Sequence, residues 1–263
     1  MQRANELKRL INKRRNQPKN LIKYGKYLSD FAVKSLHKTD ANGYVVGISG
    51  GVDSALALAI LATTPGIRVM GVFIDIESQR MDREDAKSLT SQFNFQYRYI
   101  NLTKVYRTLV KQLRLGKRPT AKANLKARLR TIALYALAQE HNLLTVGTTN
   151  AAEKVVGYYT KFGDNACDLA LLCNLTKSQI YYLAGEYNVP KDIIARKPSA
   201  GFYEGQTDEA ELELTYKEID HYLSFAAIDP LKETKINTKY IRNKHKLNAP
   251  IKPKKFMLLR NCK

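Results

Sequence analysis

Apolar runs of strand length alternate with helix-patterned segments through the middle of the chain. The short runs are rich in β-branched and aromatic residues, which favour strands, and the longer segments repeat apolar positions at helical spacing. This pattern predicts strands at 44–48, 67–75, 95–102 and 143–149. It predicts helices at 52–62, 81–93, 103–115 and 121–141.

The alternation of strands and helices predicts the fold class. Successive parallel strands need helical crossovers, and those helices cover both faces of the sheet. We therefore expect an α/β fold with a doubly wound, mainly parallel sheet of Rossmann-like type. Right-handed crossovers place functional loops at the carboxyl ends of the strands. The segments GISGG (47–51) and GTTN (147–150) should therefore lie at one edge of the sheet.

The pattern becomes less regular after residue 150. Helices are predicted at about 176–187 and 209–225, and the segment between them contains Pro and Gly, which are typical of an irregular loop. A basic helix near the N-terminus and a basic tail at about 228–263 flank this core. No internal repeat divides the sequence, so we expect a single domain over 1–263.

The amino-acid composition limits the classes of protein to which this chain can belong. The chain has 263 residues, of which 44% are hydrophobic, as in an ordinary globular core. The sequence contains neither a run long enough for a transmembrane helix nor a signal-peptide pattern. Its three cysteines include no CxxC pair, which argues against a disulfide framework or a zinc site and suggests a reducing compartment. We expect a cytoplasmic protein without a membrane partner.

The formal net charge of +20 is the most conspicuous property of the composition. Such a charge suits a protein that binds nucleic acid, but it also suits one that handles phosphorylated ligands. The sequence carries no RGG repeat, zinc finger or RRM signature beside its basic ends. Charge therefore leaves both classes open.

A glycine-containing loop follows the first predicted strand. Ser49, Gly50 and Gly51 would present consecutive backbone N–H groups at the positive end of a helix, where phosphate binds. The lysine of a Walker A loop is absent, and Asp53 stands near its place. A carboxylate beside phosphates needs a cation between them, and Mg²⁺ fits that arrangement. A plain turn, with Asp53 as a favourable helix-end charge, is the alternative.

The string SGGVDS (49–54) resembles the pyrophosphate loop of the N-type ATP pyrophosphatases, which cleave ATP between its α and β phosphates. Later segments taken singly have ordinary interpretations as a solvated helix face, a polar loop, a helix start or a linker. In their order along residues 20–256, they closely resemble ammonia-dependent NAD synthetase. These segments are NLKARLRTIALYALA (124–138), GTTNAAEKVVGYYTKFGDNACD (147–168), NLTKSQI (174–180), RKPSAGFYEGQTDEAELELTY (196–216) and HKLNAPIKPKKF (245–256).

The resemblance implies a homodimeric ligase of the PP-loop fold that forms a carbon–nitrogen bond. Deamido-NAD, ATP and ammonia would give NAD, AMP and pyrophosphate through a deamido-NAD adenylate, with Mg²⁺ as cofactor. A lid at about 200–210 would keep water from the adenylate. Because the loop begins at residue 47, we expect no preceding glutaminase domain, so free ammonia or a separate subunit supplies the nitrogen.

The resemblance also assigns roles to residues by position in the matching motifs. Expected at the ATP site are Gly47, Ile48, Ser49, Gly50, Gly51, Val52, Asp53, Ser54, Thr148, Lys177 and Ser199. Expected at the deamido-NAD site are Arg128, Tyr135, Lys161, Asp168, His245 and Lys246. Expected as Mg²⁺ ligands are Asp53 and Glu153. Expected in catalysis are Asp53, Lys177 and, near ammonia, Asp164.

Two other classes share the same loop. A tRNA-modifying enzyme that adenylates an RNA base is favoured by the charge, but Cys167 and Cys173 do not form a thiolation-type CxxC arrangement. A non-catalytic nucleotide-binding protein would not need Asp53, Glu153 and Lys177 together. We therefore expect small-molecule ligands and no nucleic-acid partner.

Overall fold

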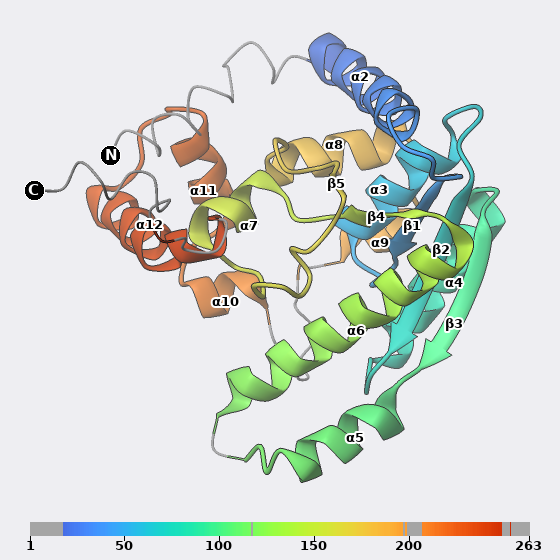
Figure 1. Ribbon diagram of the computed structural model, residues 1–263. Coiled ribbons are helices and arrows are strands. Elements are labelled where there is room, and N and C mark those ends of the chain that lie inside the picture. Colours follow the sequence, from blue (N-terminus) through green and yellow to red (C-terminus); the bar gives the residue numbers. More distant parts are fainter. Residues whose placement is uncertain (1–17, 117, 197, 199–206, 249–252, 254–263) are drawn as a thin grey trace, which may run out of the picture.

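A five-stranded parallel sheet forms the centre of the molecule in the computed structural model, which describes residues 18–116, 118–196, 198, 207–248 and 253 (Figure 1). Its strands stand in the order β3-β2-β1-β4-β5, and each neighbouring pair is parallel. They are β1 Tyr44–Gly47, β2 Val69–Asp75, β3 Gln96–Asn101, β4 Leu144–Gly147 and β5 Leu169–Ala170.

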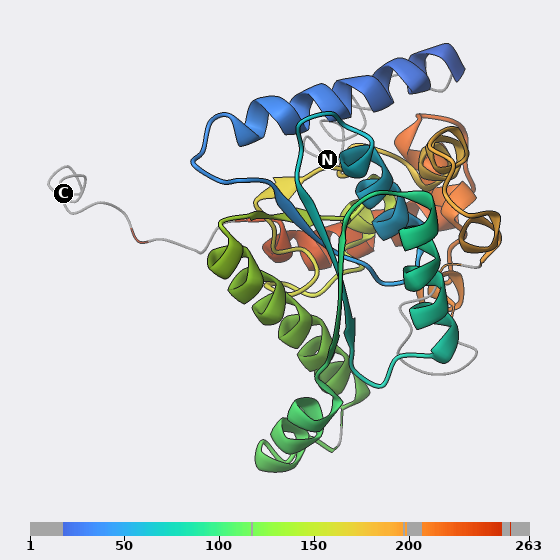
Figure 2. The same cartoon turned by 90° about the vertical axis from the view of Figure 1, so that its right-hand side faces the viewer.

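Helices pack against both faces of this sheet, so the doubly wound α/β fold is confirmed. One face packs against α2 Pro18–Leu36, α3 Val52–Ala62, α4 Arg80–Gln92 and α8 Lys177–Glu186. The opposite face packs against α5 Thr103–Gln112 and α6 Pro119–His141. Figure 2 shows α4 and α6 on opposite sides of the strands.

Strand β1 is apolar throughout because both of its faces are covered. Successive side chains of a strand point to opposite faces, so Tyr44 and Val46 pack with α3 while Val45 packs with α6. All three side chains are fully buried. The Tyr44 hydroxyl donates a hydrogen bond of 2.7 Å to the carbonyl oxygen of Ala32 and thereby ties α2 to the sheet.

The strand order reverses at β1, which pairs with β2 on one side and with β4 on the other. In open α/β sheets, ligands bind at the carboxyl ends of the strands where the order reverses. The loops after Gly47 and Gly147 both leave the sheet at this edge, as predicted. The fold therefore positions a site between them.

A smaller group of helices with its own apolar core lies beside the sheet domain (Figure 1). It comprises α7 Ala151–Val156, α10 Asp208–Leu212, α11 Tyr216–Leu223, α12 Pro230–Asn243 and the 3₁₀ helix η2 Lys244–Lys246. Buried side chains such as Val155, Leu212 and Ile236 join these helices. Nowhere in the described part of the chain is a helix long and apolar enough to cross a membrane.

Several boundaries differ from the sequence prediction. The helix expected over 209–225 is two helices, because Glu213 has a left-handed φ of 52° that ends α10 and the Thr215 hydroxyl then caps α11. Helix α7 and strand β5, of six and two residues, were not predicted. The expected irregular loop contains α9 Lys191–Ala195, and the basic tail contains α12.

Candidate functional site

The loop between β1 and α3 places backbone N–H groups at a helix end. The N-terminus of α3 begins after Gly51, and no side chain caps it. Gly50 has a φ of 84°, and a Cβ there would lie 2.8 Å from the carbonyl oxygen of Asp82, so glycine is required. An uncapped helix end behind a tight loop is suited to binding phosphate.

Ser54 holds this loop in shape from within. Its hydroxyl accepts a hydrogen bond from the backbone N–H of Ser49 at 3.1 Å and donates one to the carbonyl oxygen of Gly51 at 2.9 Å. The side chain is only 2% exposed. We had expected Ser54 to hold phosphate; the structure shows it ordering the loop, and a contact with phosphate stays a prediction.

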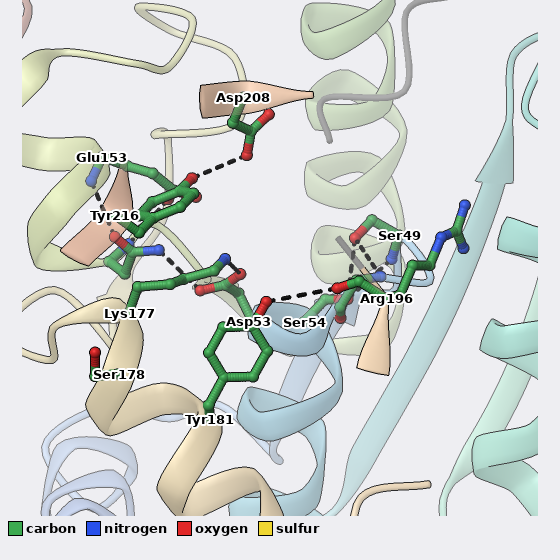
Figure 3. Close-up of polar contacts among 12 residues, drawn as sticks. Ser49, Asp53, Ser54, Glu153, Lys177, Ser178, Tyr181, Arg196, Asp208 and Tyr216 are labelled. Atoms are coloured by element: carbon green, nitrogen blue, oxygen red, sulfur yellow. Dashed lines mark hydrogen bonds and ion pairs between the residues drawn. The ribbon is translucent and has the colours of Figure 1, made fainter. Parts of the chain in front are cut away.

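A buried ion pair lies directly beside the loop (Figure 3). The ammonium of Lys177, at the start of α8, donates to the Oδ2 atom of Asp53 at 2.5 Å. The other oxygen of Asp53 accepts a hydrogen bond of 2.9 Å from the side-chain amide of Asn150. Burial acts to lower the pKa of Lys177, but the carboxylates of Asp53 and Glu153 outweigh it and raise that pKa. Lys177 therefore remains a cation.

Glu153 adds a second carboxyl group to this centre. It belongs to a capping box: the N–H of Asn150 donates to Glu153 at 3.0 Å, and the N–H of Glu153 donates to the side-chain oxygen of Asn150 at 2.9 Å. Burial and the nearby charge of Asp53 raise the pKa of Glu153 to about 8. A divalent cation bound here would favour the ionised form of Glu153, so Asp53 and Glu153 together fit Mg²⁺.

A cavity of about 320 Å³ opens at this edge of the sheet. Its wall contains the ends of β1, β2 and β4 together with parts of α6, α7 and α8. The structure brings twelve of the predicted residues into this wall: Gly47, Ile48, Ser49, Gly51, Val52, Asp53, Ser54, Tyr135, Thr148, Glu153, Asp164 and Lys177. Ser199 lies outside the described residues, and Gly50 packs behind the wall against Asp82.

The predicted deamido-NAD residues form a second neighbourhood beside the cavity. The guanidinium of Arg128 donates two hydrogen bonds, of 3.3 and 3.2 Å, to the carbonyl oxygen of Lys161. The hydroxyl of Tyr135 lies 3.5 Å from Asp168, whose other oxygen accepts bonds of 2.7 Å from the N–H and hydroxyl of Thr145. Arg128, Lys161 and Asp168 are not in the cavity wall.

His245 and Lys246 come from the 3₁₀ helix η2 and also lie outside the cavity wall. His245 is exposed, whereas the ammonium of Lys246 donates to the carbonyl oxygens of Gly157 and Tyr159 at 2.7 and 2.9 Å. Within one chain, Lys246 therefore braces the segment that leads to Lys161.

Asp164 lies at the end of that segment, where its side chain is exposed and forms part of the cavity wall. Its Oδ1 atom accepts a hydrogen bond of 2.7 Å from the N–H of Thr160. The surrounding protein reduces the hydration of the Asp164 carboxyl and raises its pKa, although this hydrogen bond and the charge of Lys246 act in the opposite direction. A raised pKa makes the carboxylate a stronger proton acceptor.

Several residues at the site were not predicted from the sequence. The carboxylate of Asp220 accepts hydrogen bonds from the N–H groups of Lys177 and Ser178 at 3.2 and 2.8 Å, so α11 positions the start of α8. The Tyr216 hydroxyl donates to Asp208 at 2.8 Å, and the Lys177 ammonium lies 4.9 Å from the Tyr216 ring centroid (Figure 3). These contacts join residues on different helices, so no pattern of neighbouring residues in the sequence predicts them.

Comparisons with known proteins identify relatives over most of this chain. The model of the NAD synthase family matches residues 24–252. An NH(3)-dependent NAD(+) synthetase of Mycoplasma genitalium is 39% identical over 246 residues, which are 92% of this chain and 99% of that protein. Another, from Syntrophomonas wolfei, is 39% identical over 85% of this chain and 92% of that protein.

Solved structures of similar proteins share the fold. The structure of NMN synthetase from Francisella tularensis has a TM-score of 0.85 and 36% identity, covering 90% of this chain and 98% of that one. The NH3-dependent NAD synthetase from Campylobacter jejuni has a TM-score of 0.75 and 26% identity, covering 89% and 99%. With its sequence matched almost from end to end, this chain belongs to the NAD synthase family.

Proposed function

We propose that this protein is a ligase that amidates deamido-NAD with ammonia at the expense of ATP, giving NAD, AMP and pyrophosphate. The observation that carries the proposal is the buried ion pair between Asp53 and Lys177 beside the uncapped N-terminus of α3. That arrangement suits a polyphosphate next to a cation. The relatives named NH(3)-dependent NAD(+) synthetase support ammonia as the nitrogen donor.

In the first step, a carboxylate oxygen of the nicotinate ring attacks the α-phosphorus of ATP. The bond between that phosphorus and the bridging oxygen breaks, and pyrophosphate leaves with its electron pair. Both reactants are anionic, so the chain must position them and reduce their repulsion. The loop amides, with Ser49 at their centre, and the ammonium of Lys177 serve this purpose. Thr148 and Ser199 complete the proposed ATP site.

Asp53 and Glu153 are the proposed ligands of Mg²⁺. When bound there with ATP, the ion would supply positive charge that stabilises the leaving pyrophosphate. Two carboxylates and phosphate oxygens are a donor set that Mg²⁺ accepts. We expect Asp53→Asn and Glu153→Gln each to raise the Mg²⁺ concentration needed for half-maximal ATP binding, measured by titration calorimetry without the other substrates.

In the second step, ammonia attacks the carbonyl carbon of the adenylate, and AMP leaves with the electrons of the carbon–oxygen bond. Ammonium must first lose a proton, and the proposed acceptor is the carboxylate of Asp164. Its exposed position at the cavity wall and its raised pKa support this role. A lid at about 200–210 is proposed to exclude water during this step, and its residues 200–206 lie outside the described part of the chain.

The deamido-NAD site is proposed to comprise Arg128, Tyr135, Lys161, Asp168, His245 and Lys246. Because several of these lie outside the cavity of one chain, we propose that a second copy completes the site in a homodimer. The exposed side chain of Ile132 stands one turn from Arg128 on α6 and supports an interface there. Sedimentation analysis of the purified protein tests the dimer, and a monomer that is active at all concentrations would contradict it.

Nicotinate mononucleotide is a second candidate substrate. The observation that favours it is the TM-score of 0.85 with an NMN synthetase, against 0.75 with an NAD synthetase. Deamido-NAD and nicotinate mononucleotide carry the same nicotinate carboxylate, so the same chemistry applies to both. They differ in that deamido-NAD also contains an AMP moiety. We retain deamido-NAD as the first candidate because the curated relatives carry that activity in their names.

One assay tests these proposals together. Purified protein is given ATP, Mg²⁺ and either deamido-NAD or nicotinate mononucleotide, with ammonium chloride or glutamine, and the amide product and AMP are followed. We expect NAD from deamido-NAD with ammonium and none with glutamine. A higher kcat/KM for nicotinate mononucleotide would select the second candidate. The absence of either product would contradict the proposed reaction.

We further propose that residues 1–263 act as one synthetase domain in the cytoplasm and need no nucleic-acid partner. Cys167 and Cys173 are free thiols in the structure, in keeping with a reducing compartment. The net charge of +20 is consistent with substrates that carry several phosphates. Salt-sensitive binding of tRNA at the concentrations that support NAD formation would contradict this view.

A further inference from the structure

Helix α6 presents a regular stripe of side chains to the cavity. The residues of α6 in the cavity wall are Ala127, Arg130, Thr131, Leu134 and Tyr135. Their spacing of three and four positions places them on one face of the helix. The sequence had directed attention to Arg128, which lies beside this stripe and bonds to the carbonyl oxygen of Lys161. Arg130 is thus the arginine of this helix that borders the cavity.

One edge of the Arg130 guanidinium is anchored to the protein. Its Nε atom donates to the carbonyl oxygen of Ile74 at 3.1 Å, and its Nη2 atom donates to the Ser78 hydroxyl at 3.4 Å. Guanidinium has five N–H donors in a fixed plane, so these two bonds define the orientation of the group. The remaining N–H groups, including both on Nη1, have no partner among the described residues.

Arg130 also differs from the other cations of the cavity wall, which are Lys177 and Arg196 among the residues that the structure describes. Lys177 pairs with Asp53, and Arg196 pairs with Asp82 and Asp85 at 2.5 and 2.7 Å. No carboxylate of the described chain lies within ion-pair distance of Arg130. The charges of Asp82, Asp75 and Asp164 act on Arg130 from beyond ion-pair distance. Its free N–H groups therefore remain available to an anion that enters the cavity.

The position of Arg130 indicates which anion it meets. Its anchors, Ile74 and Ser78, belong to the end of β2 and the loop that follows. Strand β2 pairs with β1, and the N–H of Ile48 in the phosphate loop donates to the carbonyl oxygen of Val72 at 2.9 Å. Asp82, whose backbone packs against Gly50 of the loop after β1, also acts on Arg130 through its charge. Arg130 therefore lies near the end of β2, the strand next to that loop.

We infer that Arg130 binds the α-phosphate of ATP, the phosphate that stays with adenosine in the adenylate and in AMP. The inference rests on the proposed function for its nucleotide and adds the group that holds the phosphate after pyrophosphate has left. On this assignment, the loop amides and Lys177 are left to bind the β and γ phosphates. A guanidinium fixed by its other edge is pre-organised for two bonds to phosphate oxygens.

The test compares AMP with adenosine, which lacks the phosphate, by titration calorimetry on purified protein. The variants are Arg130→Lys and Arg130→Met, with Arg242→Lys on the exposed face of α12 as the matched control. We expect both Arg130 variants to weaken AMP binding about ten-fold or more, as for a lost charge-assisted bond. Adenosine binding should change less than two-fold, and the control should match the parent chain.

Structural damage is distinguished from a binding role by the same data. Arg130→Met removes the hydrogen bonds from the guanidinium to Ile74 and Ser78 and can lower stability. Thermal unfolding of each variant is therefore measured in parallel. Ser78→Ala keeps the Arg130 guanidinium but removes one of the two hydrogen bonds that orient it. This variant should weaken AMP binding by a smaller factor than the Arg130 variants do. Equal weakening of AMP and adenosine, no weakening of either, or a failure of every Arg130 variant to fold would overturn the inference.

These measurements do not involve deamido-NAD or ammonia. If the parent protein forms no NAD but the Arg130 variants bind AMP more weakly, the proposed reaction is contradicted and the role of Arg130 is supported. If the parent protein forms NAD and the Arg130 variants bind AMP as tightly as the parent, the reaction is supported and the role of Arg130 is contradicted. A parent chain that binds neither AMP nor ATP would overturn both.

Discussion

The ammonium of Lys177 lies 2.5 Å from the Oδ2 atom of Asp53, although 124 positions separate the two residues in the chain. The pair joins the first turn of α3 to the first turn of α8, and both helices begin at the cavity. The side chain of Lys177 is 4% exposed, so water screens the pair weakly. Asp53 is therefore needed to keep this cation in place before ATP arrives.

Asp53→Asn should lower turnover by at least two orders of magnitude, because it removes the proposed metal ligand and the partner of Lys177. Asp53→Ala should also destabilise the fold, since removing one partner of a buried pair costs about 3–5 kcal/mol. Asp53→Asn keeps the volume and is compared with Asp53→Ala by urea unfolding and by AMP formation. Near-normal turnover in the asparagine variant would exclude Asp53 from the site.

Asp220→Ala should impair catalysis without contact with substrate. Its carboxylate accepts from the N–H groups of Lys177 and Ser178. Its loss leaves the buried N–H of Lys177 without this partner, at about 1–3 kcal/mol, whereas Ser178 is exposed. We expect kcat to fall about ten-fold with little change in the KM for deamido-NAD. Asp220→Asn, which can accept one of the bonds, should recover part of the rate. Identical rates in both variants would argue that Asp220 only stabilises the fold.

Arg128→Ala should raise the KM for deamido-NAD more than the KM for ATP, by about ten-fold for a lost charged contact. The residue lies outside the cavity wall and holds the carbonyl oxygen of Lys161, another proposed deamido-NAD residue. Arg242→Ala on α12 is the control for loss of one positive charge. If both KM values rose equally, Arg128 would have no separate role in binding deamido-NAD.

Asp164→Asn should change how stability depends on pH. Because reduced hydration raises the pKa of Asp164, the folded chain retains a proton that the unfolded chain has lost. This group therefore makes stability fall as pH rises from the ordinary aspartate range to the raised pKa. Asparagine does not titrate, so the variant does not lose stability in this way as pH rises. Its free energy of unfolding, relative to the parent, should therefore increase across this window in urea titrations. A constant difference at every pH would contradict the raised pKa.

The same variant tests the proposed role with ammonia. If Asp164 accepts the proton, the acidic limb of kcat/KM for ammonium should disappear in Asp164→Asn, and the remaining rate should be at least a hundred-fold lower. Lys246→Met removes a charge that lowers the pKa of Asp164, so it should move this limb to higher pH. An unchanged limb in both variants would assign the titration to another group.

Local pattern was sufficient for four of the five strands of the central sheet. The first helix after the loop was predicted at 52–62 and spans Val52–Ala62. It is recognisable because an apolar strand, a glycine turn and an apolar helix follow one another without interruption. Short elements escaped prediction: α7 depends on a capping box between Asn150 and Glu153, and β5 has two residues that pair only because β4 lies alongside.

The chain sequence by itself determined the alternation of strands and helices, the glycine loop at 49–54 and the family to which the motifs belong, since each depends on neighbouring residues. Tertiary structure alone decided that Lys177 meets Asp53, that Asp220 supports Lys177, and that Arg130 rather than Arg128 borders the cavity. These outcomes depend on how α6, α8 and α11 pack around the sheet. Charges far apart in sequence acquire their partners, and their pKa values, only when that packing excludes water.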